Sequence, residues 1–200
     1  TEPRHASMAC RIRHVRALSA PLCAVLLAGC ASTVVSLTPS PQAPVCERSA
    51  TALVLWAPEW RPEQKDVAQR EAAAAKGLQD FFGSSGCFAQ AALRRMQSLG
   101  ATAVSAQRAA EAGRFDRVVV IAVRELGPVV KLLSSAALVE GGTEVQLHVS
   151  ILSVPGGAPP RAFTVHWRNG GPGVLRGVAS LPADMQAALV AALQPGEAVR

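Results

Sequence analysis

The sequence predicts an α/β domain in which helices pack against a mixed sheet with an antiparallel meander, as a two-layer or three-layer sandwich. Three observations predict this fold class. Residues 117–125 (RVVVIAVRE) are apolar and β-branched on both faces, which is typical of a central strand. Residues 144–152 alternate between apolar and polar side chains, which is typical of a strand with one solvated face. Residues 63–82 carry an apolar stripe with helical spacing.

The first strand and the first helix are expected in the segment before the central strand. Residues 51–57 (TALVLWA) form a short apolar run before Pro58, which fits a buried strand better than a helix. Pro62 suits the first turn of a helix, where Glu63 and Asp66 would interact favourably with the helix dipole. The helix has one apolar face and then two glycines at its end: Val67, Ala74, Ala75, Leu78, Phe81 and Phe82, followed by Gly83 and Gly86.

A second strand is expected at residues 88–93, and a second helix at 104–112, which would stop at Gly113. After the central strand, turns are predicted at two pairs of residues that favour turns, Gly127 with Pro128 and Gly141 with Gly142. The first of these turns would lead into a short apolar segment at 129–133.

The chain is expected to end in a strand and a helix. Residues 162–168 repeat the alternation of 144–152, so the two segments should pair as antiparallel strands. The connection SVPGGAPPR is too rich in proline and glycine to be a strand itself. Ser180 is expected to cap a helix that runs to about Leu193 and turns these residues to the core: Leu181, Met185, Ala188 and Leu189.

The N-terminal segment has the three-part plan of an export signal. Three arginines, Arg11, Arg13 and Arg16, precede an apolar run at 17–27, which is too short to be a stable membrane span. The run ends in Leu27, Ala28, Gly29 and Cys30, which resembles the lipobox of bacterial lipoproteins. This resemblance implies diacylation of the Cys30 thiol, cleavage before Cys30 and acylation of the new amine.

The organisation that follows from this reading has four parts. Residues 1–29 are the expected signal peptide, with Met8 as the expected start and 1–7 as an upstream extension. Residues 30–45 are rich in Ser, Thr and Pro and predict an extended, solvated tether. Residues 46–194 have the length of a single periplasmic domain, and 195–200 form a short tail.

Cysteine usage and charge depend on the same reading. Cys10 and Cys23 leave with the signal, so Cys46 and Cys87 are the remaining thiols in an oxidising compartment, which favours a disulfide over two separately buried thiols. The signal holds four arginines and one glutamate, so its removal lowers the net charge from +6 to +3. With export and this smaller charge, nucleic acid is not an expected partner.

The order of elements resembles a group of small periplasmic domains. The predicted helix that ends at Ala112 and Gly113 leads through Phe115 and Asp116 into the central strand. This order is similar to that of the CsgG, TolB N-terminal and penicillin-binding-protein-activator families, over roughly residues 52–193. The resemblance implies a strand and a helix followed by an antiparallel meander, and it transfers no functional residues. Many members of these families are lipoproteins, and CsgG-like domains oligomerise.

Two histidines are the first candidates for chemistry. If the strands at 144–152 and 162–168 pair about a loop centred near Gly157, His148 lies directly opposite His166 on the wet face. Two such imidazoles could bind zinc or copper, but a site needs three or four ligands. We therefore expect a solvated polar face and no metal.

Three further motifs have structural explanations. The glycines of 170–177 have the wrong spacing for a nucleotide-binding loop, so a surface loop is expected and no cofactor. The segment Gly83-Ser84-Ser85-Gly86 lacks the last glycine of a serine hydrolase elbow and fits a helix stop. Glu140 and Glu144 are expected to flank the predicted glycine turn. No nucleophile and base pair emerges, so the sequence predicts a protein that is not an enzyme.

The function expected from these observations is that of a lipid-anchored protein of the outer membrane, facing the periplasm, which binds a protein partner. Ala31 follows Cys30, where an aspartate would favour inner-membrane retention in lipoproteins of this kind. Trp60 is the candidate partner anchor, whereas Trp56 is expected in the core. The alternative is a subunit of an oligomeric secretion or export assembly with a hairpin within 129–138. Glycan binding is less favoured, because aromatic residues make up only 4% of the chain. An envelope hydrolase is also less favoured, because no nucleophile and base pair emerges.

Overall fold

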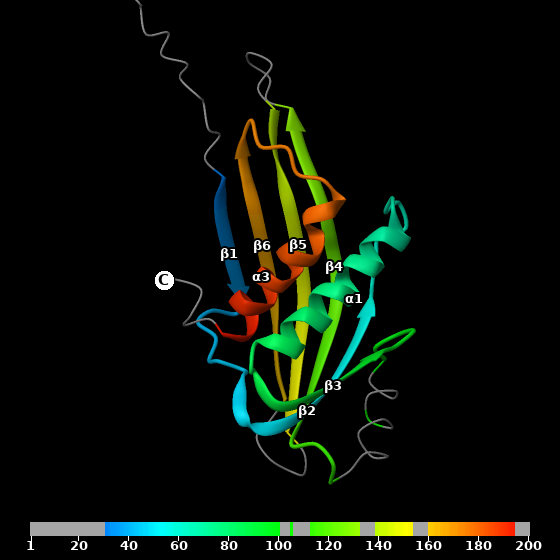
Figure 1. Ribbon diagram of the computed structural model, residues 1–200, viewed down its shortest axis with the longest axis vertical. Coiled ribbons are helices and arrows are strands. Elements are labelled where there is room, and N and C mark those ends of the chain that lie inside the picture. The colour runs from blue at the N-terminus through cyan, green and yellow to red at the C-terminus, as the bar shows by residue number, and fades with distance from the viewer. Residues whose placement is uncertain (1–30, 101–104, 106–112, 133–138, 154–159, 195–200) are drawn as a thin grey trace, which may run out of the picture.

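The computed structural model describes residues 31–100, 105, 113–132, 139–153 and 160–194. In these residues the chain forms a six-stranded sheet in the order β1-β6-β5-β4-β2-β3, with two helices on one face (Figure 1). The strands are β1 (Ser32–Thr38), β2 (Glu47–Pro58), β3 (Phe88–Arg95), β4 (Arg117–Leu132), β5 (Val139–Ser153) and β6 (Arg161–Pro172). The helices are α1 (Val67–Ser84), a short 3-10 turn η1 (Val178–Ser180) and α3 (Leu181–Leu193).

The predicted fold class is confirmed. Strand β2 pairs in parallel with both β3 and β4, while β4, β5 and β6 form an antiparallel meander. Strand β1 pairs antiparallel with β6, so β1 and β3 are the two edge strands of the described sheet. The sheet is thus mixed, and α1 and α3 make the second layer over the described residues.

The main core lies between the sheet and the helices. Most apolar members of the predicted alternation in β5 and β6 are buried, so this alternation is confirmed: Val145, Leu147, Val149, Phe163, Val165 and Trp167. Trp56 is 4% exposed and belongs to this core, as expected. The largest side chains from the two layers include Phe81, Leu78, Ile121, Phe163, Met185 and Leu189. Burying each such side chain contributes roughly 1.5–3 kcal/mol.

Strands β2 and β4 are also buried on the face away from the helices. Leu53, Leu55, Val118 and Val120 form a small second cluster there, against which Met96, Leu99 and Phe115 pack. Both faces of these two strands are therefore apolar, which explains why the first half of β4 lacks alternation. The start of β4 is held to β2 by the Asp116 carboxylate, which accepts hydrogen bonds from the backbone N–H and the hydroxyl of Thr51. These hydrogen bonds, assisted by the nearby Arg117, lower the pKa of Asp116.

The predicted disulfide between Cys46 and Cys87 is present. It joins the residue before β2 to the residue before β3, across 41 positions of sequence. In the chain-entropy model a loop of this length stabilises the fold by roughly 3–4 kcal/mol.

The segment predicted to be a solvated tether contains β1, so the expectation of no regular structure there is wrong. All but one of the side chains of Ser32–Thr38 are exposed, and the strand is held by backbone pairing with β6. Pairing of this kind needs no apolar period, which is why the composition of the segment did not predict a strand. The folded unit therefore includes Ser32–Thr38 and does not start at Cys46.

Both predicted glycine turns are also wrong. Strand β4 runs through Gly127 and Pro128, and β5 runs through Gly141 and Gly142. Proline, which has no N–H to donate, is tolerated at this point because β2 pairs with β4 only as far as Val123, so among the described strands only β5 pairs with β4 at Pro128. The glycines are required by close approach, since a Cβ on Gly142 would lie 2.4 Å from the carbonyl oxygen of Asn169.

The helix starts differ from prediction in two details. Helix α1 begins at Val67, so Pro62 and Glu63 precede it, and Asp66 has a left-handed backbone with no capping hydrogen bond from its side chain. Ser180 does precede α3, but its hydroxyl donates to the carbonyl oxygen of Gly177 instead of capping the helix. The helix predicted at 104–112 lies outside the described residues except for Ser105.

The two helices touch where α1 has a glycine. A Cβ on Gly77 would lie 2.6 Å from Cβ of Met185 and 2.7 Å from the carbonyl oxygen of Pro182. We expect Gly77→Ala to lower the free energy of unfolding by about 1–3 kcal/mol, because the helices must move apart. Gly83, on the same helix, has no atom within 4 Å of an added Cβ. Gly83→Ala should therefore raise stability by about 0.5–1 kcal/mol.

Urea denaturation of the purified domain measures both variants. A Gly77→Ala protein as stable as the wild type would show that the close contact between α1 and α3 does not determine how the helices pack.

Candidate functional site

A groove of about 430 Å³ lies between the edge strand β1 and helix α3. Its walls are Thr33 and Val35 of β1, Trp167 and Asn169 of β6, and Ala183, Asp184, Ala187, Val190 and Ala191 of α3. Alanines on α3 leave this space, because larger side chains would fill the gap between the helix and the edge of the sheet. Val35 is 41% exposed, whereas Trp167 is buried. The groove is therefore mainly apolar and open to solvent on the β1 side.

One end of the groove is polar. The Asp184 side chain is 6% exposed, and its Oδ1 accepts a hydrogen bond from Nη1 of Arg176 at 3.2 Å. Its Oδ2 is buried and has no hydrogen-bond partner among the described residues. Nδ2 of Asn169 donates to Oγ1 of Thr33 at 2.8 Å, while its Oδ1 also lacks a partner. Thr143, which pairs with Asn169 across the strands, is fully buried with an unpartnered hydroxyl.

These unpartnered oxygens are costly, because a buried polar atom without a hydrogen bond costs about 1–3 kcal/mol. Asp184 lies in the first turn of α3, where the helix dipole favours a negative charge. The dipole accounts for the charge but leaves Oδ2 without a donor. Oδ1 of Asn169 and Oδ2 of Asp184 thus give the groove two acceptors that no neighbouring group in the described chain uses.

Among the described residues, no strand pairs with the outer side of β1, and the strand lacks the charges and prolines that protect many edge strands. Residues 32–38 (STVVSLT) contain no charge and no proline, and Val34 is 60% exposed. The opposite edge, β3, ends in Arg94 and Arg95, and charges of this kind discourage pairing with other strands. Within the part of the chain that the structure describes, β1 therefore offers unpaired backbone groups and exposed apolar side chains to another chain.

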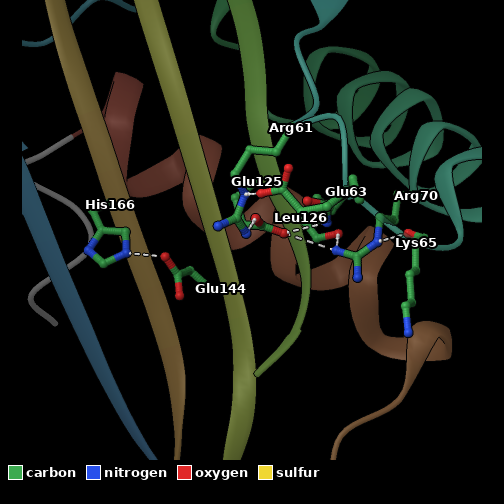
Figure 2. A network of polar contacts seen from close by, with 9 residues as sticks. Arg61, Glu63, Lys65, Arg70, Glu125, Leu126, Glu144 and His166 are labelled. Atoms are coloured by element: carbon green, nitrogen blue, oxygen red, sulfur yellow. Dashed lines mark hydrogen bonds and ion pairs between the residues drawn. The ribbon is translucent and has the colours of Figure 1, made fainter. Parts of the chain in front are cut away.

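A second polar cluster lies where β4 leaves β2 (Figure 2). Arg70 of α1 is buried, and its Nη1 donates to Oε1 of Glu125 at 3.0 Å and to the carbonyl oxygen of Leu126 at 2.6 Å. Its Nε donates to the carbonyl oxygen of Lys65. The Glu125 carboxylate also accepts hydrogen bonds from Arg61 and Gln64. A buried ion pair with these additional hydrogen bonds on both partners is a structural link between α1 and β4.

Gly127 makes room for this ion pair. A Cβ at this position would lie 1.6 Å from Nη1 of Arg70. The glycine that suggested a turn in the sequence is thus needed for the approach of the arginine to β4.

The two histidines lie on the wet face of the meander, but they are not opposite each other. His148 pairs with Thr164, and His166 pairs with Gln146, so the predicted register is wrong by two residues. A shift of two keeps both side chains on the same face, which the alternation alone cannot distinguish. His166 contacts Oε1 of Glu144 at 2.6 Å, as Figure 2 shows, and His148 contacts Oγ1 of Thr164 at 3.4 Å.

The acidic residues of the predicted glycine turn are on β5 instead. Glu140 accepts a hydrogen bond from Arg168 at 2.7 Å, and Glu144 is the partner of His166. Over the residues that the structure describes, no three His, Cys, Asp or Glu side chains come together as a metal site would need. No helix in the same residues is long and apolar enough to cross a membrane.

The other predicted site residues are placed as follows. Trp60 is partly buried against the main core, with an unpartnered Nε1, so it does not protrude from the domain. Cys30 lies outside the described residues. Ser84 ends α1 and donates to the carbonyl oxygen of Asp80, in agreement with a helix stop. The first glycines of 170–177, Gly170 and Gly171, belong to β6 and not to a loop.

The sequence contained one unused signal for the groove. Asp184 lies three positions after Leu181 and four before Ala188, which are both on the buried face of α3. A carboxylate at that spacing is a buried acid in an apolar stripe, and buried acids often mark functional sites.

No family model matches the sequence, and no curated protein matches it. Among solved structures, the chain is similar to PelC from Paraburkholderia phytofirmans, described as a dodecamer, with 17% identity and a TM-score of 0.42. That match covers 79% of this chain and 95% of the other. A homologue of a neuraminyllactose-binding hemagglutinin from Helicobacter pylori has 9% identity and a TM-score of 0.38, over 78% of this chain and 88% of the other. Likenesses of this size assign no function to the chain.

The two arginines on Glu125 allow a matched test of the buried ion pair. The Arg70 side chain is 9% exposed, and that of Arg61 is 65% exposed. We expect Arg70→Met to lower the free energy of unfolding by about 3–5 kcal/mol, because Glu125 loses its buried partner. Arg61→Met should cost less than about 1 kcal/mol, since exposed pairs contribute little. Equal losses in chemical denaturation would contradict the structural role of Arg70.

Proposed function

We propose that this chain is a lipid-anchored protein of the outer membrane that binds an extended segment of another envelope protein along β1. The observation that carries the proposal is the outer edge of β1, where no described strand pairs with the backbone and two valines are exposed. Peptide segments commonly add to such an edge as a further strand, where backbone hydrogen bonds give affinity. The domain has no catalytic role in this proposal.

The position of β1 in the chain supports this assignment. Ser32, the first residue of β1, follows the expected lipid site, Cys30, by two residues. Two residues span at most about 7 Å, so an acylated Cys30 would hold β1 directly at the membrane surface. A partner strand would thus be received beside the periplasmic face of the outer membrane, without the spacing that a long tether would give.

A second candidate is a subunit of an oligomeric secretion or export assembly. The exposed Val130, near the end of β4, and the edge of β1 are two surfaces through which copies of the chain could associate. This candidate predicts that the partner at β1 is another copy of the same chain.

The lipid anchor is tested by labelling cells with radioactive palmitate. The wild-type protein should incorporate the label and fractionate with the outer membrane, and Cys30→Ser should abolish both. The double variant Cys46→Ser with Cys87→Ser is the matched control, because it removes two other cysteines and should keep the label. Label in Cys30→Ser, or wild-type protein in the soluble fraction, would contradict the anchor.

The partner is tested with a photo-crosslinking amino acid in place of Val34. Irradiation of intact envelopes should link the chain to a second protein at this position, because an added strand would lie beside it. The same amino acid in place of Ala89, which is exposed on the opposite edge strand β3, should give no such product. A product that contains two copies of this chain would favour the oligomeric assembly. Products of equal yield at both positions, or none, would contradict binding along β1.

A further inference from the structure

We infer that the groove beside β1 selects the partner strand by a basic side chain, which binds at the polar end next to Asp184. This inference rests on the proposed function, because it names the chemistry of the segment that β1 receives. The evidence for it is the pair of unpartnered oxygens, Oδ2 of Asp184 and Oδ1 of Asn169, in the wall of an otherwise apolar groove.

An added strand would cover this groove. Side chains alternate along a strand, so every second residue of a strand paired with β1 would point toward the helix layer. Thr33 and Val35 are the β1 residues that line the groove, and they face the same way as Trp167 and Asn169. The two partner residues beside Thr33 and Val35 would therefore enter the groove, two positions apart in the partner sequence.

The two ends of the groove require different side chains. At the end formed by Thr33, Asn169 and Asp184, a hydrogen-bond donor would satisfy acceptors that are otherwise unpaired. Arg176 occupies only Oδ1 of Asp184. Oδ2 is buried in the described chain, so the Asp184 side chain would turn toward the groove to pair with an ammonium or guanidinium group from outside.

The other end contains no unpartnered polar atom in the described chain. It is lined by Val35, Ala187 and Ala191, which favour an apolar side chain. The geometry thus points to a segment with a lysine or arginine two positions from an apolar residue.

The β1 strand of a second copy does not supply this pattern. Residues 32–38 contain no lysine and no arginine, so β1 of another copy would leave Oδ2 of Asp184 without a donor. The other edge strand, β3, has Leu93 two positions before Arg95, but Arg95 is already paired with Glu71. The occupant is therefore assigned as a different protein, and pairing between copies becomes an outcome of the test.

The test uses the crosslinker at Val34 as the reporter, because Val34 lies on the other face of β1 and does not enter the groove. Thr33→Lys places the chain's own ammonium group at the polar end, where it would compete with the partner's basic side chain. Ser36→Lys is the matched control, since it adds the same charge to the same strand on the face away from the groove. We expect Thr33→Lys to lower the yield of the crosslinked product by roughly tenfold relative to Ser36→Lys.

Asp184→Asn removes the charge at nearly constant shape. It should lower the yield roughly tenfold as well, because a charged hydrogen bond is replaced by a neutral one. Thermal denaturation of each variant identifies any loss that comes from unfolding. If Asp184→Asn is unfolded, Thr33→Lys decides, since Thr33 is an exposed residue on an edge strand.

The sequence of the crosslinked partner peptide gives the second readout. The inference predicts a lysine or arginine two positions from an apolar residue in the segment beside β1. A partner segment without a basic residue, or equal yields for Thr33→Lys and Ser36→Lys, would overturn the inference while leaving a protein partner at β1. The absence of any crosslinked protein in the wild type would instead contradict the proposed function itself.

Discussion

The contact between Arg70 and Glu125 is the interaction on which the arrangement of the helix layer depends. It fixes the first turn of α1 to β4 where β4 passes the end of β2, and Gly127 gives the arginine its space. Helix α1 in turn positions α3, because the two helices approach through Gly77. The groove beside β1 is bounded by α3. Its width is therefore set by a chain of contacts that begins at a buried ion pair.

The second constraint is the mismatch between the two layers. Six strands are wider than two packed helices can cover, since helices pack 8–10 Å apart and strands about 4.8 Å apart. The helices cover the middle of the sheet, so an edge strand must lie beyond them, as Figure 1 shows for β1. A strand in that place gains little from side-chain burial and is held by its backbone. The same geometry leaves its outer backbone groups free for another strand.

The parts of the fold that bury side chains were predictable, and those held by the backbone were not. The alternation of β5 and β6, the apolar run of β2 and the stripe of α1 all follow from burial. Strand β1 was missed because its side chains are exposed, and Gly141 and Gly142 suggested a turn although they serve close packing of strands. The register of His148 and His166 failed because burial fixes which face a residue takes and not its partner across the strands. Asp184 could have been noticed as an acid within an apolar stripe.

The unpartnered oxygens at the polar end of the groove lower the stability of the free protein, and this loss is the strongest reason to connect that end with binding. An apolar residue at position 184 would extend the apolar stripe of α3 and leave no orphan oxygen, and serine or asparagine could also interact with the helix N-terminus. In strands β5 and β6, Thr143 and Asn169 also carry oxygens without a hydrogen-bond partner in the described chain. Gly142 and Gly170 lie in the same two strands and bring them into close contact. Departures from ordinary packing that gather at one place are typical of functional sites, where stability is given up locally. A donor brought by a partner strand would remove this cost only in the complex, so the free energy recovered adds to the affinity.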